Sequence, residues 1–448
     1  ILMKIVIAGA GAVGFHLAEL LSKEDHDITL IDIDESVLTQ ANRHLDVLCI
    51  CGDVATLGIL EEAQVKKAQL FISVTTSEKT NLLAAILAKQ LGVKNTIARI
   101  TNIEHLKDSD QKRFKELGID VLISPQQLAA LEIERLLQRA SFTDHFEFEG
   151  GKISVVGFTL DTLCPLNNYT IREIDERNKD FLFRGIALLR GSDTLIPTGD
   201  TRLQKGDHLY IATQQENLEL ARKFVGKQLK PIKNVMIIGG TPLALRAAQR
   251  LENKYSVTIV LKDEFRGKKF LEELDNALII NADPSDVDAL KEEGLEQMDA
   301  FVALTPNSEI NILASLMAEE LGVYKTIAQV ENVDYTRLSQ NIGIDTIINK
   351  KLIAANDIFK FVRKGKVEAV ASLHGVDGEI IEFEVHKNNR LLRHPVKDLH
   401  LPSQCIIAGV VRGEKSIVPN GEFHFEINDK VIILALPEAI HKVEEIFK

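Results

Sequence analysis

A chain of 448 residues is too long for one hydrophobic core, so we expect two to four domains. Its 45% hydrophobic and 26% charged residues are typical of a globular protein, and no apolar run of about 20 residues is available to span a bilayer. The formal net charge of −12 argues against nucleic acid as a partner, although an acidic chain can still dock on a basic protein surface.

The beginning of the chain has the pattern of a dinucleotide-binding turn. Residues 4–8 are mostly apolar, as in a strand buried on both faces, and apolar residues at helical spacing follow over 13–23. In such a turn the first glycine permits a tight bend, the second lets a pyrophosphate approach the backbone, and the third lets the helix pack on the strand. The alternative is a glycine turn that only packs. The residues of the turn are Gly9, Ala10, Gly11, Ala12, Val13 and Gly14.

Strands and helices then alternate up to about residue 140. The second strand ends in Asp32, where a carboxylate can accept hydrogen bonds from ribose hydroxyls. We expect strands at 4–8, 27–32, 47–51, 70–74, 96–100 and 120–123, and helices at 13–23, 35–44, 57–63, 79–90, 111–117 and 125–139. This alternation predicts an α/β fold of the Rossmann type, with helices on both faces of a parallel sheet.

Further candidate residues follow the later strands of this lobe, at the sheet edge where open α/β folds bind ligands. Asp53 follows the third strand, and Thr75 and Thr76 follow the fourth. Arg99 is a charged residue among apolar neighbours in the fifth strand, so we expect it to meet an anionic group. The alternative for Arg99 is an internal ion pair with Asp53 or Asp120.

The rest of the chain repeats this plan. From about residue 146 to 225 the pattern changes to short strands with turn signals and a final helix, which indicates a small α+β lobe. Residues 234–244 echo the first glycine turn at an offset of 230, and 367–447 echo the small lobe. We therefore expect Rossmann-type lobes at 1–140 and 232–362, and small lobes at 141–226 and 363–448.

The second glycine turn is altered. It reads Gly-Gly-Thr-Pro-Leu-Ala over residues 239–244, and Thr241 and Pro242 are poorly suited to a pyrophosphate. Either Lys262 or, with a loop one residue shorter, Leu261 takes the place of Asp32. We expect this copy to bind a dinucleotide weakly or not at all.

Other chemistry has little support in the sequence. Cys49 and Cys51 lie in an apparently buried strand, where packing is favoured over metal binding, and we expect neither a metal site nor a catalytic residue. The small lobes lack an arrangement that would serve as acid and base over a nicotinamide ring. The few cysteines suit a reducing cytoplasm.

These motifs together resemble the TrkA family, the cytoplasmic NAD-binding regulatory subunits of bacterial Trk potassium-uptake systems, which consist of tandem RCK (or KTN) domains. The resemblance covers essentially the whole chain. It rests on the first glycine turn, on residues 31–32, 52–53, 74–81, 97–100 and 123–126, and on the small-lobe strands at 406–412 and 428–432.

The resemblance implies a regulator that is not an enzyme. NAD or NADH, with ATP or ADP possible, would bind the first lobe: the glycine turn would hold phosphates, Asp32 the ribose, Asp53 would lie near adenine, and Thr75, Thr76 and Arg99 near the distal half. A tetrameric ring would sit in the cytoplasm, peripheral on the inner face of the membrane through an integral membrane potassium transporter of the TrkH type. The alternatives are an NAD-dependent oxidoreductase with a small substrate lobe, and a ring protein with a permanent nucleotide.

Overall fold

The computed structural model of the chain describes residues 3–22, 26–138, 142, 145–162, 164–178, 183–191, 193–226, 230–332, 346–363, 369–373, 376, 378–387 and 389–447. They form two compact units, one of residues 1–131 with 349–362 and one of 132–348 with 363–448. Among the described residues, no helix combines the length and the apolar character that crossing a membrane requires.

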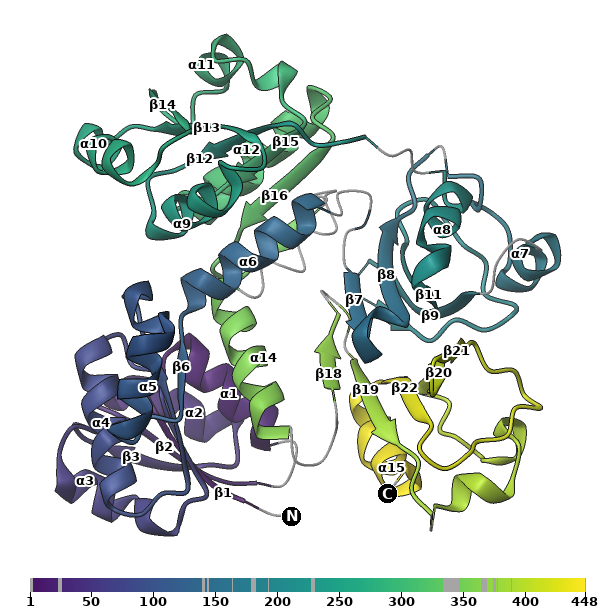
Figure 1. Cartoon of the computed structure of the whole chain (residues 1–448), viewed down its shortest axis with the longest axis horizontal. Helices are drawn as coiled ribbons and strands as arrows, with labels where there is room; N and C mark the ends of the chain where they lie inside the picture. Colours follow the sequence, from purple (N-terminus) through teal and green to yellow (C-terminus); the bar gives the residue numbers. More distant parts are fainter. Residues whose placement is uncertain are drawn as a thin grey trace. The chain divides into compact units, whose positions relative to one another are not determined.

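The first Rossmann lobe is built on a six-stranded parallel sheet, drawn in purple to blue in Figure 1. Its strand order, β3-β2-β1-β4-β5-β6, is that of a dinucleotide-binding sheet. The strands are β1 Lys4–Ala8, β2 Asp27–Asp32, β3 Leu48–Cys51, β4 Leu70–Ser73, β5 Asn95–Arg99 and β6 Val121–Ile123. The helices are α1 Ala12–Ser22, α2 Glu35–His44, α3 Leu57–Glu62, α4 Glu78–Gln90, α5 Asp108–Glu116 and α6 Pro125–Gln138.

Both faces of this sheet are covered, because side chains of a strand alternate between its faces. In β1, Ile5 and Ile7 enter the core formed with α1 and α2, whereas Val6 and Ala8 enter the core formed with α3 and α4. All four side chains are fully buried. The apolar run of residues 4–8 is thus explained by a strand with helices on each side.

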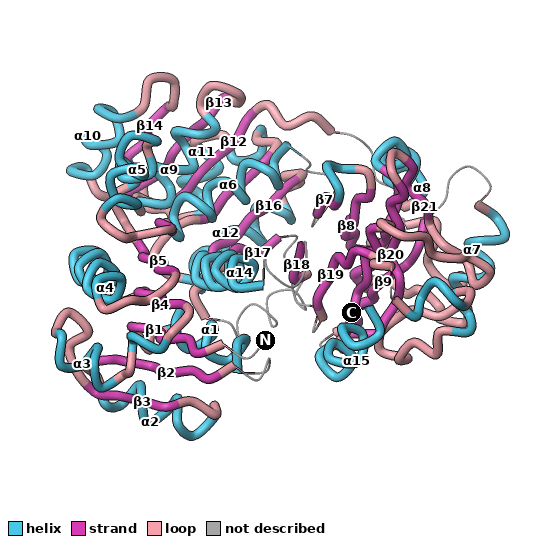
Figure 2. The backbone as a smooth tube through the Cα atoms, turned by 60° about the horizontal axis from the view of Figure 1, so that its bottom comes forward, coloured by secondary structure: helices cyan, strands magenta, loops and turns pink. Residues whose placement is uncertain are grey.

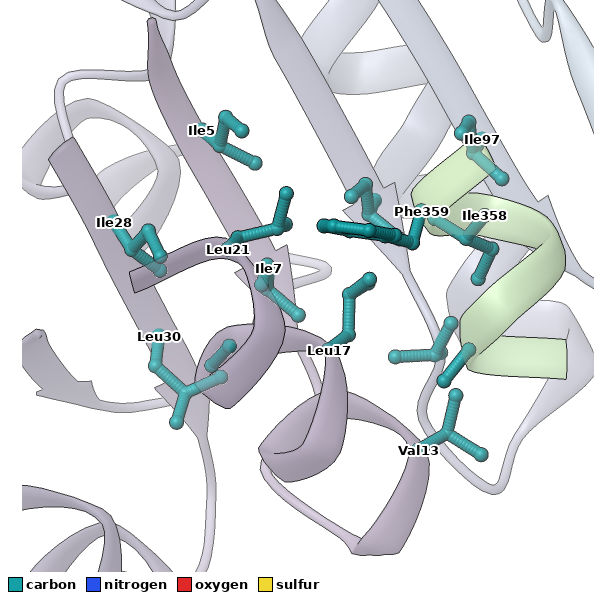
Figure 3. Packing of buried hydrophobic residues seen from close by; sticks show 14 of the residues in the cluster. Ile5, Ile7, Val13, Leu17, Leu21, Ile28, Leu30, Ile97, Ile358 and Phe359 are labelled. Atoms are coloured by element: carbon teal, nitrogen blue, oxygen red, sulfur yellow. The ribbon is translucent and has the colours of Figure 1, made fainter. Parts of the chain in front are cut away.

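A helix from the second half of the chain completes the first lobe. Helix α14 (Lys350–Arg363) belongs to the predicted 232–362 lobe, but it packs beside α1 in the first unit (Figure 1). Ile358 and Phe359 lie against Leu17 and Val13 of α1, as Figure 3 shows. The core of the first lobe therefore includes residues some 340 positions further along the sequence than α1. The domain limits given above stay predictions.

The second Rossmann lobe repeats the first, with a six-stranded parallel sheet in the order β14-β13-β12-β15-β16-β17. Its strands are β12 Asn234–Ile238, β13 Ser256–Leu261, β14 Leu278–Asn281, β15 Ala300–Ala303, β16 Lys325–Gln329 and β17 Thr346–Ile348. Its helices are α9 Pro242–Leu251, α10 Glu264–Glu273, α11 Val287–Glu292 and α12 Ser308–Glu320. The end of α6 contributes Glu134, which lies between Arg250 and Lys254 as a buried carboxylate with two cationic partners.

Each small lobe is a five-stranded sheet with a helix at its end. The strands of the first are β7 His145–Phe148, β8 Ile153–Thr159, β9 Phe183–Arg190, β10 Asp193–Leu195 and β11 His208–Gln214, with helices α7 Ile171–Arg177 and α8 Leu218–Phe224. Those of the second are β18 Ala369–Ser372, β19 Glu379–Glu384, β20 Cys405–Arg412, β21 Lys415–Ile417 and β22 Lys430–Ala435, with helix α15 Pro437–Phe447. Neighbouring strands in both sheets are antiparallel.

The same buried ion pair stabilises both small lobes. Arg190 binds Asp207 with two hydrogen bonds of 2.8 and 2.7 Å, and Arg412 binds Asp429 with two of 2.8 Å. Asp207 and Asp429 are almost fully buried. A bidentate pair suits the planar guanidinium and carboxylate, and each pair ties the end of one strand to the turn before its neighbour in the sheet, β11 or β22.

The two small lobes pack against each other through one face of each sheet. Ile153, Ile186 and Tyr210 of the first share a core with Ala408 and Ile432 of the second, and Figure 2 shows these strands close together. Hydrogen bonds from Lys152 Nζ to the Gly413 carbonyl (2.9 Å) and from Gln214 Nε2 to the Ser416 carbonyl (2.6 Å) border this core. The duplicated small lobes thus bury apolar surface against each other within one chain.

The predicted fold class is confirmed, with one correction to the strand at residues 47–51. It was expected to be buried, but β3 is an edge strand in which Leu48 and Cys51 are exposed. An edge strand has a neighbour on one side only, so its outward side chains remain in solvent.

Candidate nucleotide-binding site

The turn between β1 and α1 has the shape that its glycines predict. Gly9 has a φ of +103°, and a Cβ atom there would lie 2.8 Å from the Thr75 backbone nitrogen. A Cβ on Gly14 would lie 1.8 Å from the Gly9 carbonyl oxygen, so this glycine allows the helix to approach the strand. At Gly11, by contrast, a Cβ would have no described atom within 4 Å. Two glycines are required by packing, whereas Gly11 borders open space.

Asp32 is held against this turn. One carboxylate oxygen accepts a hydrogen bond of 2.6 Å from the Ala10 amide, and the other accepts one of 3.0 Å from the Asp34 amide. Each carboxylate oxygen can accept more than one hydrogen bond, so ribose hydroxyls can still be bound. The structure thus places Asp32, the residue predicted to bind the ribose, directly beside the glycine turn that is predicted to bind the phosphates.

Asp53 lies at the neighbouring strand end. The Gly52 amide donates to the Asp32 carbonyl at 2.8 Å, which joins the ends of β2 and β3. The Asp53 side chain is exposed and accepts a hydrogen bond of 2.9 Å from the Ala55 amide. It therefore fixes the loop before α3 while its side chain remains exposed to solvent.

The predicted distal residues have different surroundings. The Thr75 hydroxyl lies 2.7 Å from Asn81 Oδ1, so it is directed into the lobe, whereas Thr76 is exposed. Arg99 is half-buried at the carboxyl end of β5. Asp120, one of its two alternative partners, accepts a hydrogen bond of 2.8 Å from Lys89 Nζ. All the predicted site residues lie at or just beyond the carboxyl ends of β1 to β5, which are neighbours in one parallel sheet.

Two residues at the start of α4 were not predicted as part of this edge. Asn81 links Thr75 to the end of β5, and Glu78 accepts a hydrogen bond of 2.7 Å from the Asn102 amide and lies 3.2 Å from His105 Nε2. Burial raises the pKa of Glu78, but hydrogen bonds from Thr101 and Asn102 outweigh that effect and leave the pKa below its usual value. The signal in the sequence was the repeated Thr-to-Asn spacing of six residues at 75–81 and 305–311.

The second lobe keeps the first glycine of the turn, as Gly239, but differs from the first lobe at several of the other corresponding positions. The Gly239 amide donates to the Val260 carbonyl and the Ala282 amide to the Leu261 carbonyl, as Gly9 and Gly52 do with Ile31 and Asp32. Leu261, which is buried, therefore occupies the position of Asp32, and this decides between the two candidates.

Side chains of the second lobe also satisfy its own turn. The Thr241 hydroxyl accepts a hydrogen bond of 3.1 Å from the Ala244 amide and donates one of 2.9 Å to the Leu304 carbonyl. It therefore caps α9 at the helix end where α1 has Gly11, which has no side chain to do so. Arg266 Nη1 donates to the Gly240 carbonyl at 2.9 Å.

Beside this turn, Lys262 Nζ lies 2.8 Å from Asp283, and this hydrogen bond, with others from Ser285, lowers the pKa of the Asp283 carboxyl far below its usual value. The polar groups around the second turn are thus largely paired within the protein.

Comparison with known proteins gives the family. The TrkA-N domain model matches residues 5–125 and 235–350, and the TrkA-C domain model matches 155–226 and 380–448. The chain belongs to the TrkA family. A TrkA homolog of the Trk potassium-uptake system from Archaeoglobus fulgidus is 32% identical over 452 residues, covering 100% of both chains. TrkA of Haemophilus influenzae is 31% identical over 453 residues, covering 100% of this chain and 99% of that protein.

Solved structures show the same tandem fold. The GsuK RCK domain aligns with a TM-score of 0.60 at 14% identity, covering 100% of this chain and 95% of that chain. The GsuK channel bound to NAD aligns with a TM-score of 0.59 at 14% identity, covering 100% and 79%. The TrkA family is a non-enzymatic family of Trk potassium-uptake components with NAD-binding, Rossmann-like RCK domains. The prediction that the chain is not an enzyme is thereby confirmed.

Proposed function

We propose that this chain senses NAD or NADH, and adenine nucleotides such as ATP or ADP, in its first Rossmann lobe, and that the bound nucleotide gates a membrane potassium transporter of the TrkH type. The observation that carries the proposal is the turn in which Gly11 borders open space while Asp32 is held at the Ala10 amide. Membership of the TrkA family supplies the potassium-uptake context. A solved structure of GsuK, a more distant relative in fold, is bound to NAD.

In this proposal different residues of the site bind different parts of the nucleotide. The glycine turn of residues 9–14 holds the phosphates, chiefly through the amides and the favourable dipole at the start of α1, since the Gly9 and Ala10 amides donate to the Ile31 carbonyl and to Asp32. Asp32 binds the adenosine ribose and Asp53 lies near adenine. Thr75, through its backbone, Thr76 and Arg99 approach the distal half of the ligand.

The second lobe has no such site in this proposal. Leu261 removes the ribose carboxylate, and Thr241 takes up the amide at the start of α9 that a phosphate would need. We therefore expect one nucleotide per chain. Equilibrium dialysis with radiolabelled NAD measures this ratio, and a value of two per chain would show that the second turn also binds.

Regulation needs a ligand that binds two conformations of the assembly with different affinities. Coupling of about 1–3 kcal/mol, as is typical of allosteric proteins, shifts gating several-fold. We propose that the chain acts as a homotetrameric ring, peripheral on the cytoplasmic face of the membrane through the transporter. Four chains with duplicated domains give a ring of eight similar units.

Isothermal titration calorimetry tests the ligand assignment. We expect NAD or ATP to bind exchangeably at micromolar levels, about −8 kcal/mol, and to bind much more weakly to Asp32→Ala and Arg99→Ala. A nucleotide that does not exchange would favour the permanent structural ligand. Turnover of NADH with a panel of small molecules would contradict the proposal and support an oxidoreductase.

A further inference from the structure

The carboxyl ends of β4 and β5 are joined by one buried side chain. Asn81, on the first turns of α4, is 1% exposed. Its Oδ1 accepts hydrogen bonds from the Thr75 amide (2.9 Å), the Thr75 hydroxyl (2.7 Å) and the Ser73 hydroxyl (3.0 Å). Its Nδ2 donates to the Thr75 carbonyl (3.1 Å) and to the Arg99 carbonyl (3.0 Å). One amide group therefore holds two strand ends in a fixed relation.

The direction of this amide follows from its partners. A backbone N–H can only donate, so it must face Oδ1, and the two carbonyls can only accept, so they must face Nδ2. Both Nδ2 protons are used. Among side chains of this size, only asparagine offers one acceptor to the Thr75 amide and two donors to the carbonyls of Thr75 and Arg99. Any substitution of Asn81 therefore breaks at least part of the network.

The peptides that Asn81 holds carry the distal half of the proposed site. It fixes the backbone of Thr75, whose amide and carbonyl are both bonded, and the peptide that follows Arg99. The hydrogen bonds of Asn81 described above go to Ser73, Thr75 and Arg99, not to the glycine turn or to Asp32. Through Arg99 its influence is directed at the distal half of the ligand, although the Thr75 backbone that it holds also lies beside Gly9.

We propose that Asn81 is the positioning residue that sets Thr75 and Arg99 for the distal phosphate and ribose of the nucleotide. This inference rests on the proposed nucleotide function. It adds Asn81 to the site and assigns separate residues to the two ends of the nucleotide. Binding of the adenosine half depends on the glycine turn and Asp32, and recognition beyond the first phosphate depends on Asn81.

The second lobe contains a matched control. Asn311 is 1% exposed and bonds the Thr305 amide (2.9 Å), hydroxyl (2.7 Å) and carbonyl (3.0 Å), and the Gln329 carbonyl (2.9 Å). Gln329 stands where the first lobe has Arg99, beside a turn that is satisfied by its own side chains. Substitution of Asn311 thus removes the same kind of buried network without affecting the proposed ligand.

The experiment compares full-length wild type, Asn81→Ser and Asn311→Ser by calorimetric titration with NAD, ATP and AMP, alongside thermal unfolding. We expect both variants to lose thermal stability to a similar extent. Asn81→Ser should bind NAD and ATP at least tenfold more weakly, and AMP less than threefold more weakly, whereas Asn311→Ser should bind all three as wild type does. If Asn81→Ser does not fold, Asn81→Asp, which keeps an acceptor for Thr75 and loses both donors, takes its place.

Three results would overturn the inference. They are unchanged NAD and ATP binding by the folded Asn81 variant, an equal loss for AMP and NAD, and a loss of NAD binding in Asn311→Ser that matches the loss in Asn81→Ser. The second result would mean that Asn81 only stabilises the lobe. A wild-type chain that binds none of the three nucleotides would instead overturn the proposed function, and the positioning role with it.

Discussion

Gly11 and Gly14 are three residues apart in one turn, but a side chain at each would meet different surroundings. At Gly14 a Cβ would collide with the Gly9 carbonyl at 1.8 Å, whereas at Gly11 it would have no described neighbour within 4 Å. Gly14 is therefore needed for folding of the lobe. Gly11 is needed only if something else occupies the space beside it, which makes it the better residue for a test of function.

We expect Gly11→Val to leave the free energy of unfolding within about 1 kcal/mol of wild type and to abolish NAD binding, because its side chain enters the pyrophosphate space. Calorimetry and thermal unfolding measure both quantities. Thr241→Val in the second lobe is the matched control and should bind NAD normally. Gly14→Ala should instead destabilise the lobe by about 1–3 kcal/mol or more. NAD binding by Gly11→Val at wild-type affinity would contradict the placement of the ligand.

At this scale the sequence predicted the geometry of the glycine turn, whereas the nucleotide-binding roles of its residues stay predictions. Gly9, Gly11, Gly14 and Asp32 could be assigned because their roles depend on the local chain and on one strand spacing. The inward turn of the Thr75 hydroxyl could not be predicted, since it depends on Asn81 reaching back from the next helix. The choice between Leu261 and Lys262 likewise needed the register of the strands in the second sheet.

Helices α6 and α14 each contribute residues to a compact unit other than that of the Rossmann lobe whose last strand they follow. Each follows the last strand of a Rossmann lobe, yet α14 packs in the first unit and the end of α6 belongs to the second. Their contacts differ in kind: Phe359 of α14 is buried among apolar residues near α1, whereas Glu134 of α6 binds Arg250 and Lys254. The helical pattern predicted both elements, but a pattern cannot state which core receives a helix that follows the final strand of a lobe.

Phe359→Ala should destabilise the first unit by about 3–5 kcal/mol, since it removes a buried aromatic ring and leaves a cavity beside α1. Denaturant unfolding, with hydrogen exchange to locate the loss, measures the effect. Phe265→Ala removes the same ring from a side chain that is 80% exposed and should change stability by less than about 0.5 kcal/mol. Loss of protection confined to the second Rossmann lobe in Phe359→Ala would show that α14 packs elsewhere.

Glu134→Gln should destabilise the second unit at pH 7 by roughly 1–3 kcal/mol, because two cations lose a buried charged partner. Burial raises the pKa of Glu134, but hydrogen bonds and attraction from Lys254 and Arg250 outweigh it and lower the pKa below 4.5. A depressed carboxyl pKa stabilises the fold above the ordinary value, and this stabilisation is lost as the pH falls through the folded pKa. The difference in stability between the two proteins should therefore shrink as the pH falls below the ordinary carboxyl pKa, and the unfolding curves should meet only below the lowered pKa of Glu134. A difference that is constant between pH 7 and pH 3 would argue against the ion pair.

The whole chain is a duplication in which both halves keep the features that contribute to folding, whereas only one half keeps those of the proposed nucleotide site. The parallel sheets, the small-lobe ion pairs and the Asn81 and Asn311 networks are kept in both copies, because each contributes to folding. The open turn and its carboxylate are kept only in the first. This pattern is expected if one lobe binds the regulatory nucleotide and the other is retained for structure, and it fits a family that regulates potassium uptake without catalysis.

The most direct test of this account measures potassium flux. The TrkH-type transporter is reconstituted in liposomes with the wild-type chain, Gly11→Val or Thr241→Val, and flux is followed with and without NAD, NADH and ATP. We predict that at least one nucleotide changes the flux several-fold with wild type and with Thr241→Val, and that none does so with Gly11→Val. A nucleotide response that persists unchanged in Gly11→Val would contradict the claim that the first glycine turn is the sensor.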